Sequence, residues 1–76
     1  MAHEVADERS ALAARTAETG WQRHTDGRVD VYLRGASRVR VIWQGDAAIS
    51  GSSRFQDDLM ESYTRELDTV RAWLAG

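Results

Sequence analysis

Five side chains in the middle of the chain are of the types that cleave RNA. They are His24, Arg28, Asp30, Tyr32 and Arg40, which could supply a base, an acid and cations for a phosphate. A catalytic site requires such groups to converge in one pocket, and a lone histidine on a strand is more often an ordinary surface residue. We therefore predict no catalytic residue and interpret the chain as a non-enzyme.

The sequence contains few side chains or motifs of the kinds that bind metals or cofactors. The 76 residues include no cysteine and two histidines, His3 and His24. A chain without cysteine has no disulfide, no thiolate zinc site and no thiol nucleophile. Two histidines do not make a usual metal site unless several carboxylates converge on them. The Ser/Gly cluster at residues 50–53 lacks the glycine spacing and the lysine of a phosphate-binding loop. We expect neither a metal nor a cofactor.

Residues 28–44 contain the clearest structural pattern, two runs in which apolar and polar residues alternate around a short loop. Period-two alternation of β-branched and aromatic residues is typical of half-buried strands. A three-residue loop at 35–37 would pair Leu33 with Val39 and keep the apolar side chains of both strands on one buried face. These six side chains are Val29, Val31, Leu33, Val39, Val41 and Trp43.

The opposite face of this hairpin is the candidate binding surface. It would carry the five predicted site residues, Arg28, Tyr32, Arg34, Arg38 and Arg40. Arg34 would lie opposite Arg38, a like-charge pair that is destabilising without an anion. Two interpretations stay open. The face is either solvated, with arginines lying over apolar stems and pairing with acids, or a basic, partly aromatic surface that binds a partner.

The segments on either side of the strands predict two helices. Residues 4–19 are rich in Ala, Glu and Arg and predict a helix, which Gly20 ends. Residues 57–74 predict a second helix, because their apolar residues recur at helical spacing and form one stripe. Trp73 lies beside this stripe and is predicted to cover the core.

Residues 21–52 predict the antiparallel strands. A first strand begins at Trp21. A three-residue turn after this strand would bury Trp21 and turn His24 outward, whereas a two-residue turn would reverse both. Residues 47–52 are either a weak fourth strand at a sheet edge or a loop, because they are rich in Ala, Ser and Gly.

Together these elements predict one small α+β domain over residues 1–76. It has a helix, a three- or four-stranded antiparallel meander and a second helix, with both helices on one sheet face. The order resembles that of HicA-type toxins and of the double-stranded-RNA-binding fold. In HicA-type toxins a Gly-aromatic pair opens the first strand, and Gly20-Trp21 is similar to it. Their next turn carries Gly-Ser-His with the catalytic histidine, where this chain has Asp26-Gly27-Arg28. The resemblance implies the topology without the ribonuclease chemistry.

A second resemblance covers residues 20–74. Gly20-Trp21, the YLRG of 32–35, the RVRV of 38–41 and the VRAWL of 70–74 are similar to a pattern in short uncharacterised proteins of actinobacteria and their phages. This resemblance implies a small accessory protein, phage-encoded and acting in the cytoplasm of a bacterial host. It supplies no site residue.

Charge and hydropathy narrow the choice of partner. No apolar run approaches the ~18 residues of a membrane span and the N-terminus lacks an apolar signal core, so we expect a soluble, cytoplasmic chain with no membrane partner. Residues 21–44 carry five arginines and two aspartates, yet the whole chain has a net charge of −2. Overall acidity weighs against nucleic acid, because non-specific affinity comes mostly from phosphate neutralisation.

We therefore expect the arginine face to bind an acidic surface of a host protein. Nucleic-acid binding by the same face is the alternative, and a HicA-like ribonuclease is a second alternative. Homodimerisation, through an edge strand or an exposed Trp73, is a third, since a domain of this size has a small core.

Overall fold

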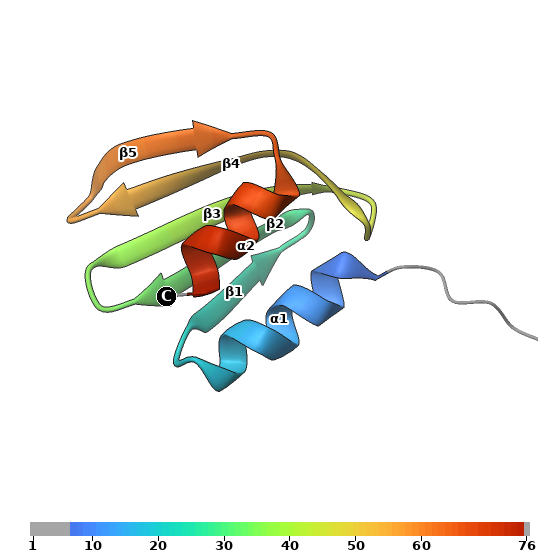
Figure 1. The fold of residues 1–76 in the computed structure, drawn as a ribbon, viewed down its shortest axis with the longest axis horizontal. Helices are drawn as coiled ribbons and strands as arrows, with labels where there is room; N and C mark the ends of the chain where they lie inside the picture. Colours follow the sequence, from blue (N-terminus) through green and yellow to red (C-terminus); the bar gives the residue numbers. More distant parts are fainter. Residues whose placement is uncertain (1–6, 76) are drawn as a thin grey trace, which may run out of the picture.

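A computed structural model describes residues 7–75 as one sheet with two helices (Figure 1). In chain order the elements are α1 (Glu8–Glu18), β1 (Gln22–Asp26), β2 (Val29–Arg34), β3 (Ser37–Gln44), β4 (Ala48–Gln56), β5 (Leu59–Thr64) and α2 (Leu67–Ala75). The strands are antiparallel and lie side by side in sequence order. The α+β class and the helix–meander–helix order are confirmed, with five strands in place of the three or four expected.

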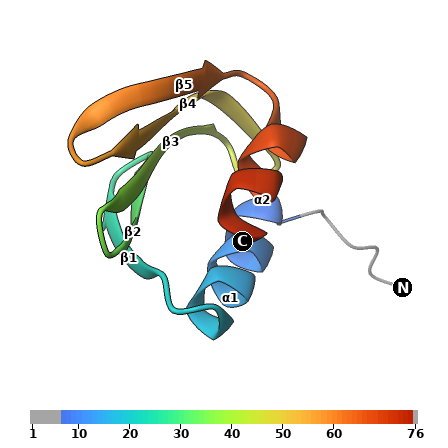
Figure 2. The same cartoon turned by 60° about the vertical axis from the view of Figure 1, so that its left-hand side comes forward.

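Both helices cover the same face of the sheet, as predicted. Figure 2 shows the strands as an arc, with α1 and α2 across its open side. Side chains of both helices and of β2, β3 and β4 meet with Trp21 in one core: Leu12, Trp21, Tyr32, Val39, Val41, Trp43, Ile49, Val70 and Leu74. Burial of such side chains is the main favourable term in the stability of a small domain. Trp73 packs against this core, as predicted.

Polar and glycine caps fix the two ends of α1. Asp7 precedes the helix, and its carboxylate accepts hydrogen bonds from the backbone N–H of Ser10 at 2.9 Å and from the Ser10 hydroxyl at 3.0 Å. The N–H contact satisfies a donor that the first helical turn leaves unpaired. Gly20, with a φ of +88°, follows the helix end as predicted. His3 and residues 4–6, the predicted start of this helix, lie outside the described residues.

The turn between β2 and β3 decides which side chains enter the core. It is a two-residue turn, Gly35-Ala36, in place of the predicted three-residue loop. Gly35 has a φ of +59°, which glycine adopts at little cost and which the favoured two-residue hairpin turns require. The register therefore pairs Tyr32 with Val39, the position that the prediction gave to Leu33.

This change of register turns every side chain of β2 to the other face. The prediction that the apolar residues of β2 share the buried face is wrong, because they lie on the side away from the helices and are only partly buried. These residues are Val29, Val31 and Leu33. Asp30 and Tyr32 take their place, and both are fully buried. The β3 half of the prediction, with both valines and Trp43 in the core, is confirmed.

Of the two orientations considered for the first strand, the structure has the one with Trp21 buried and His24 outward. A two-residue turn between β1 and β2, Gly27-Arg28, produces it because β2 is itself reversed. Trp21 is buried just before β1, and its Nε1–H donates to the carbonyl of Leu74 in α2 at 3.2 Å. His24 is exposed on the face away from the helices, since it pairs with a residue of that face.

The second helix is shorter than predicted. It begins at Leu67, and residues 57–66 of the predicted helix form a turn, strand β5 and a short connection. Asp57 and Asp58 have φ values of +53° and +68°. A two-residue hairpin turn needs this left-handed conformation, and Asp tolerates it better than most residues do. The helical spacing of apolar residues thus describes a helix only from Leu67 onward.

Residues 47–52, expected at an edge or in a loop, belong mostly to an inner strand. β4 lies between β3 and β5 and begins at Ala48. Its small residues leave room for neighbours on both faces. Ser52 is buried on the helix side, where its hydroxyl donates to the carbonyl of Arg40 at 2.8 Å. On the other side, a Cβ at Gly51 would collide with the phenol ring of Tyr63.

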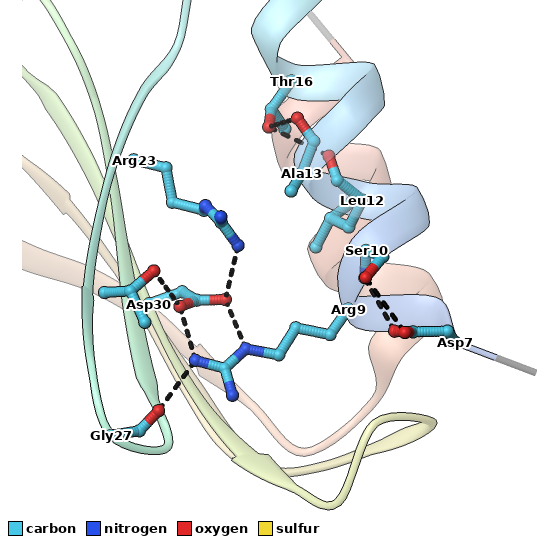
Figure 3. Close-up of polar contacts among 10 residues, drawn as sticks. Asp7, Arg9, Ser10, Leu12, Ala13, Thr16, Arg23, Gly27 and Asp30 are labelled. Carbon is cyan, nitrogen blue, oxygen red and sulfur yellow. Dashed lines mark hydrogen bonds and ion pairs between the residues drawn. The ribbon is translucent and has the colours of Figure 1, made fainter.

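A buried ion pair ties α1 to the sheet (Figure 3). Asp30 is fully buried, and its carboxylate accepts hydrogen bonds from Arg9 Nε at 2.9 Å and Nη2 at 2.7 Å. Thr25 donates a third hydrogen bond at 2.9 Å, and Arg23 Nη1 lies 3.7 Å from the carboxylate. Arg9 also donates to the carbonyl of Gly27 at 2.9 Å. The pair is therefore hydrogen-bonded on both sides, as a buried charge requires.

Asp30→Asn should destabilise the fold by about 3 kcal/mol, because it leaves the largely buried Arg9 guanidinium without a countercharge. Asp58→Asn is the matched control. Asp58 is 93% exposed and lies 3.7 Å from Arg38, so its loss should stay below about 0.5 kcal/mol. Urea unfolding followed by tryptophan fluorescence measures both free energies. Equal, small losses in the two variants would contradict a stabilising role for the Arg9–Asp30 pair.

Acid should remove the same stabilisation. Burial alone would raise the pKa of Asp30, but hydrogen bonds from Arg9 and Thr25 outweigh it and hold the pKa below its ordinary value of 3.8. The carboxylate therefore contributes stability above the unfolded-state pKa and loses it as the pH falls through the lower folded-state pKa. The difference in free energy of unfolding between wild type and Asp30→Asn should be constant from neutral pH to about pH 5 and shrink below about pH 4. A difference that does not vary with pH would refute this.

Candidate functional site

The sheet face turned away from both helices carries a mixed apolar and cationic surface. Cross-strand pairing places Leu33, Arg38, Phe55 and Met60 in one row and Val31, Arg40, Ser53 and Tyr63 in the next. We call this side the outer face. In Figure 2 no helix or strand that the structure describes lies over it. The outer face includes the apolar side chains of Val31, Leu33, Ile42, Phe55, Met60 and Tyr63.

The apolar side chains of the outer face are unusually accessible. Met60 is 59% exposed and Tyr63 is 58% exposed, and the four others are half-buried. The Tyr63 ring packs against Gly51, because glycine has no side chain that would keep the ring away from the sheet. Single exposed apolar residues are ordinary, but a contiguous group on one sheet face is typical of an interaction surface.

Two arginines lie within this apolar group. The Arg38 guanidinium stacks over Phe55, 4.2 Å from the ring centre, and is 3.7 Å from the highly exposed Asp58 carboxylate. Arg40 follows two residues later on the same face and is exposed. No residue in the described part of the chain forms an ion pair with Arg40. Two cations held beside apolar side chains can bind carboxylates in partly desolvated surroundings, where ion pairs are stronger than in water.

The five predicted site residues do not share one surface. Arg38 and Arg40 lie together on the outer face, and Arg28 is exposed in the turn between β1 and β2. Tyr32 and Arg34 lie on the helix side, so the prediction that all five share one face is wrong. The two-residue turn at Gly35, described above, is the physical reason.

Tyr32 belongs to the core. Its side chain is fully buried, and burial together with the nearby Asp30 carboxylate raises the pKa of the phenol to about 12. The hydroxyl has no hydrogen-bond partner among the described residues, although Arg23 is close enough to offset part of the shift. A buried phenol of this kind stabilises the core through its ring and cannot contact a partner.

Arg34 is a structural residue on the helix side. Its guanidinium lies over the ring of Trp21, 4.4 Å from the centroid, and Nη1 donates to the carbonyl of Thr19 at 3.0 Å. These contacts hold the connection between α1 and β1 against the sheet. Such a role accounts for an arginine at this position without any ligand.

The side chains suited to ribonuclease chemistry are separated by the sheet. His24 and Arg40 are on the outer face, whereas Asp30 and Tyr32 are buried on the helix side. Asp30 is already bound to Arg9, so it is not available as a proton donor. Within residues 7–75, no group of three or more His, Cys, Asp or Glu side chains could hold a metal ion. Neither described helix is long and apolar enough to cross a membrane.

A groove of about 330 Å³ runs between α1 and α2 on the other side of the molecule. Leu12 and Leu74 line its floor, and Arg15 and Arg71 lie at its rim. Arg71 is already paired with two acids, Glu8 and Asp68. Leu12 and Leu74 are almost fully buried, so the groove offers a ligand less apolar surface than the outer face does.

The outer face contains residues that the sequence analysis did not select. Met60 and Tyr63 were assigned to a helix and Phe55 to no element, so they were not placed beside Arg38 and Arg40. Alternation does not mark this strand, because Met60 and Tyr63 are three residues apart; the available signal was the pair of turn-forming aspartates, Asp57 and Asp58, before it. Comparison of the chain with protein-family models, curated proteins and solved structures gave no significant match.

Tyr32→Phe should leave the free energy of unfolding within about 1 kcal/mol of wild type, because the hydroxyl that it removes is buried without a partner. Tyr32→Ala should cost about 3–5 kcal/mol through the cavity left in the core. Urea denaturation measures both changes. A large loss in Tyr32→Phe would show that the hydroxyl is bonded.

Proposed function

We propose that this chain is a non-enzymatic module that binds a protein partner through the outer face of its sheet. The observation that supports the proposal is an open face on which exposed apolar side chains surround Arg38 and Arg40. Aromatic and arginine side chains are the residues that most often dominate binding energy at protein interfaces. The partner surface is apolar with carboxylates at its centre.

The arrangement of Arg38 favours binding over simple solvation. Stacking on Phe55 restricts the guanidinium, so less side-chain entropy is lost when a carboxylate binds it. Asp58 is the only described acid paired with Arg38, and its high exposure means that a partner carboxylate can displace it at small cost. The outer face therefore holds its cations in place while leaving their donors accessible.

The sequence resemblance to short actinobacterial and phage proteins suggests where the module acts. We take the partner to be a protein of the bacterial host, and the site of action to be the host cytoplasm. A small accessory protein with one binding face suits such a role, because it needs only a stable sheet and a complementary surface.

Nucleic-acid binding by the same face is the second candidate. It is favoured by the combination of two arginines with the exposed Tyr63, since exposed aromatic rings stack on bases and cations contact phosphates. It is opposed by the net charge of −2 and by the apolar residues that fill the rest of the face. Phosphate neutralisation supplies most non-specific affinity, and two arginines neutralise few phosphates.

Charge reversal on the outer face should abolish partner capture. Immobilised wild type, incubated with nuclease-treated lysate of an actinobacterial host, should retain a protein partner that mass spectrometry identifies. Arg38→Glu and Arg40→Glu should each lower its retention at least about tenfold, the effect of losing about 1.4 kcal/mol at an interface centre. Circular dichroism checks that each variant is folded.

Arg15→Glu is the matched control, because it makes the same charge change on an exposed arginine of α1. It should retain the partner as wild type does. Equal retention by all four proteins would contradict the proposal. Capture that disappears on nuclease treatment, and that weakens steeply with salt, would favour nucleic acid instead.

A further inference from the structure

Strand β5 is an open and apolar sheet edge. It is the last strand of the sheet, and in both Figure 1 and Figure 2 no helix or strand of residues 7–75 lies beyond it. The three large apolar side chains that are most exposed in the described chain all belong to it: Leu59 at 73%, Met60 at 59% and Tyr63 at 58%. An exposed apolar edge presents unpaired backbone groups beside side chains that gain from burial, and such edges pair with other strands.

The opposite edge of the sheet, strand β1, is protected by polar and charged residues against pairing with another chain. β1 consists of five polar residues, all exposed, and includes Arg23, His24 and Asp26. Charged side chains on an edge strand disfavour pairing with another chain. The contrast between the two edges therefore indicates that β5, and not β1, is suited to pairing with another strand.

A bulge in β5 gives the strand an unusual symmetry. Arg54 pairs with Ser62 and Phe55 pairs with Met60, so Glu61 is an extra residue. In a regular strand Met60 and Tyr63 would point to opposite faces, but the extra residue puts both on the outer face. Residues three apart can then occupy facing positions when two such strands pair antiparallel.

We propose that two copies of this chain pair antiparallel through β5, with Met60 facing Tyr63 of the partner subunit. The same register places Leu59 opposite the partner's Thr64, which is also on the helix side of the sheet. It also places Asp58, just before β5, opposite the partner's Arg65, just after it. The twofold axis repeats each contact. Glu61 and the partner's Ser62 then lie at the twofold axis, the Met60–Tyr63 contacts flank them, and opposite charges meet at both ends.

The self-complementary pattern is the reason for choosing a second copy over another strand. A six-residue strand whose apolar pair and flanking charges both match under one twofold operation fits an isologous interface. The resulting sheet has ten strands, and the outer faces of the two subunits become one continuous surface. The inference goes beyond the proposed function, since it concerns the edge of the sheet. It covers Met60 and Tyr63 of the outer face and leaves Arg38 and Arg40 accessible on β3.

Sedimentation velocity over the micromolar to millimolar range tests the dimer. Wild type should dimerise, and Met60→Glu and Tyr63→Glu should each raise the dissociation constant at least about tenfold. His24→Glu, an exposed position on the opposite edge, is the matched control and should leave the dissociation constant unchanged. A monomeric wild type, or equal weakening by His24→Glu, overturns the proposal. Thermal unfolding checks that each variant keeps its fold.

Disulfide cross-linking tests the register. The chain has no cysteine, so introduced thiols are the only ones present. An oxidised mixture of Met60→Cys and Tyr63→Cys should form mixed disulfide dimers. Met60→Cys alone should not, because Met60 and Tyr63 pair with β4 residues two positions apart, so its two thiols would be offset by about 7 Å along the strands and would lie diagonally across the interface. Cross-linking of Met60→Cys alone, or no cross-linking in the mixture, overturns the register.

The two proposals fail separately. Arg40→Glu should abolish partner capture and leave the dimer intact, since Arg40 lies on β3, away from the β5 edge. Loss of the dimer in Arg40→Glu would show that the outer faces themselves associate, which contradicts edge pairing. A dimer that persists while capture fails would leave edge pairing standing and remove only the proposed function.

Discussion

The contact between Arg9 and Asp30 is the constraint on which the rest of the structure depends. A buried carboxylate has to be paired, and only the helix-facing side of β2 brings Asp30 to Arg9. Apolar residues could have filled the same space at similar or greater stability, as they often can for buried ion pairs. What the ion pair adds is specificity. A slip of β2 by one residue would leave Arg9 without its partner and would turn Tyr32 out of the core.

The outer face follows from this arrangement. Since Asp30 and Tyr32 occupy the inner side of β2, the apolar residues that alternate with them, Val31 and Leu33, are turned away from the helices. Neither helix can cover them, because both lie on the side where Arg9 meets Asp30. A surface that is costly to expose is thus produced by the same register that completes the core. Its apolar character is a direct reason to expect a partner there.

The sequence predicted the parts of the fold that depend on local pattern. Alternation in β3 identified Val39, Val41 and Trp43 as core residues, and Gly20 correctly ended the first helix. The register of β2 could not be predicted, because a two-residue and a three-residue turn at Gly35 are both ordinary and the choice depends on the distant Arg9. β5 was missed because its apolar residues also fit helical spacing. Only the left-handed turn at Asp57 and Asp58 separates the two alternatives, and a carboxylate pair is equally suited to a helix N-terminus.

For the outer face, the sequence predicted two of its arginines but the wrong neighbours for them. Arg38 and Arg40 were correctly placed side by side on one face, because alternation within a single strand is independent of register. Tyr32 and Arg34 were misplaced with β2, and Phe55 and Tyr63 were missed with β4 and β5. Placing residues of different strands on the same face requires the strand register, which a single sequence does not determine.

The hydrogen bond from Trp21 to the carbonyl of Leu74 carries a consequence for how the chain folds. It joins residues 53 positions apart, whereas each strand pairs with its sequence neighbour through a short turn. The hairpins can therefore form early and independently, and the core closes only when α2 docks over a sheet that already exists. Docking of α2 should consequently be the slow event in folding and its undocking an early event in unfolding. The meander would then form the folding nucleus, and α2 would pack onto it last.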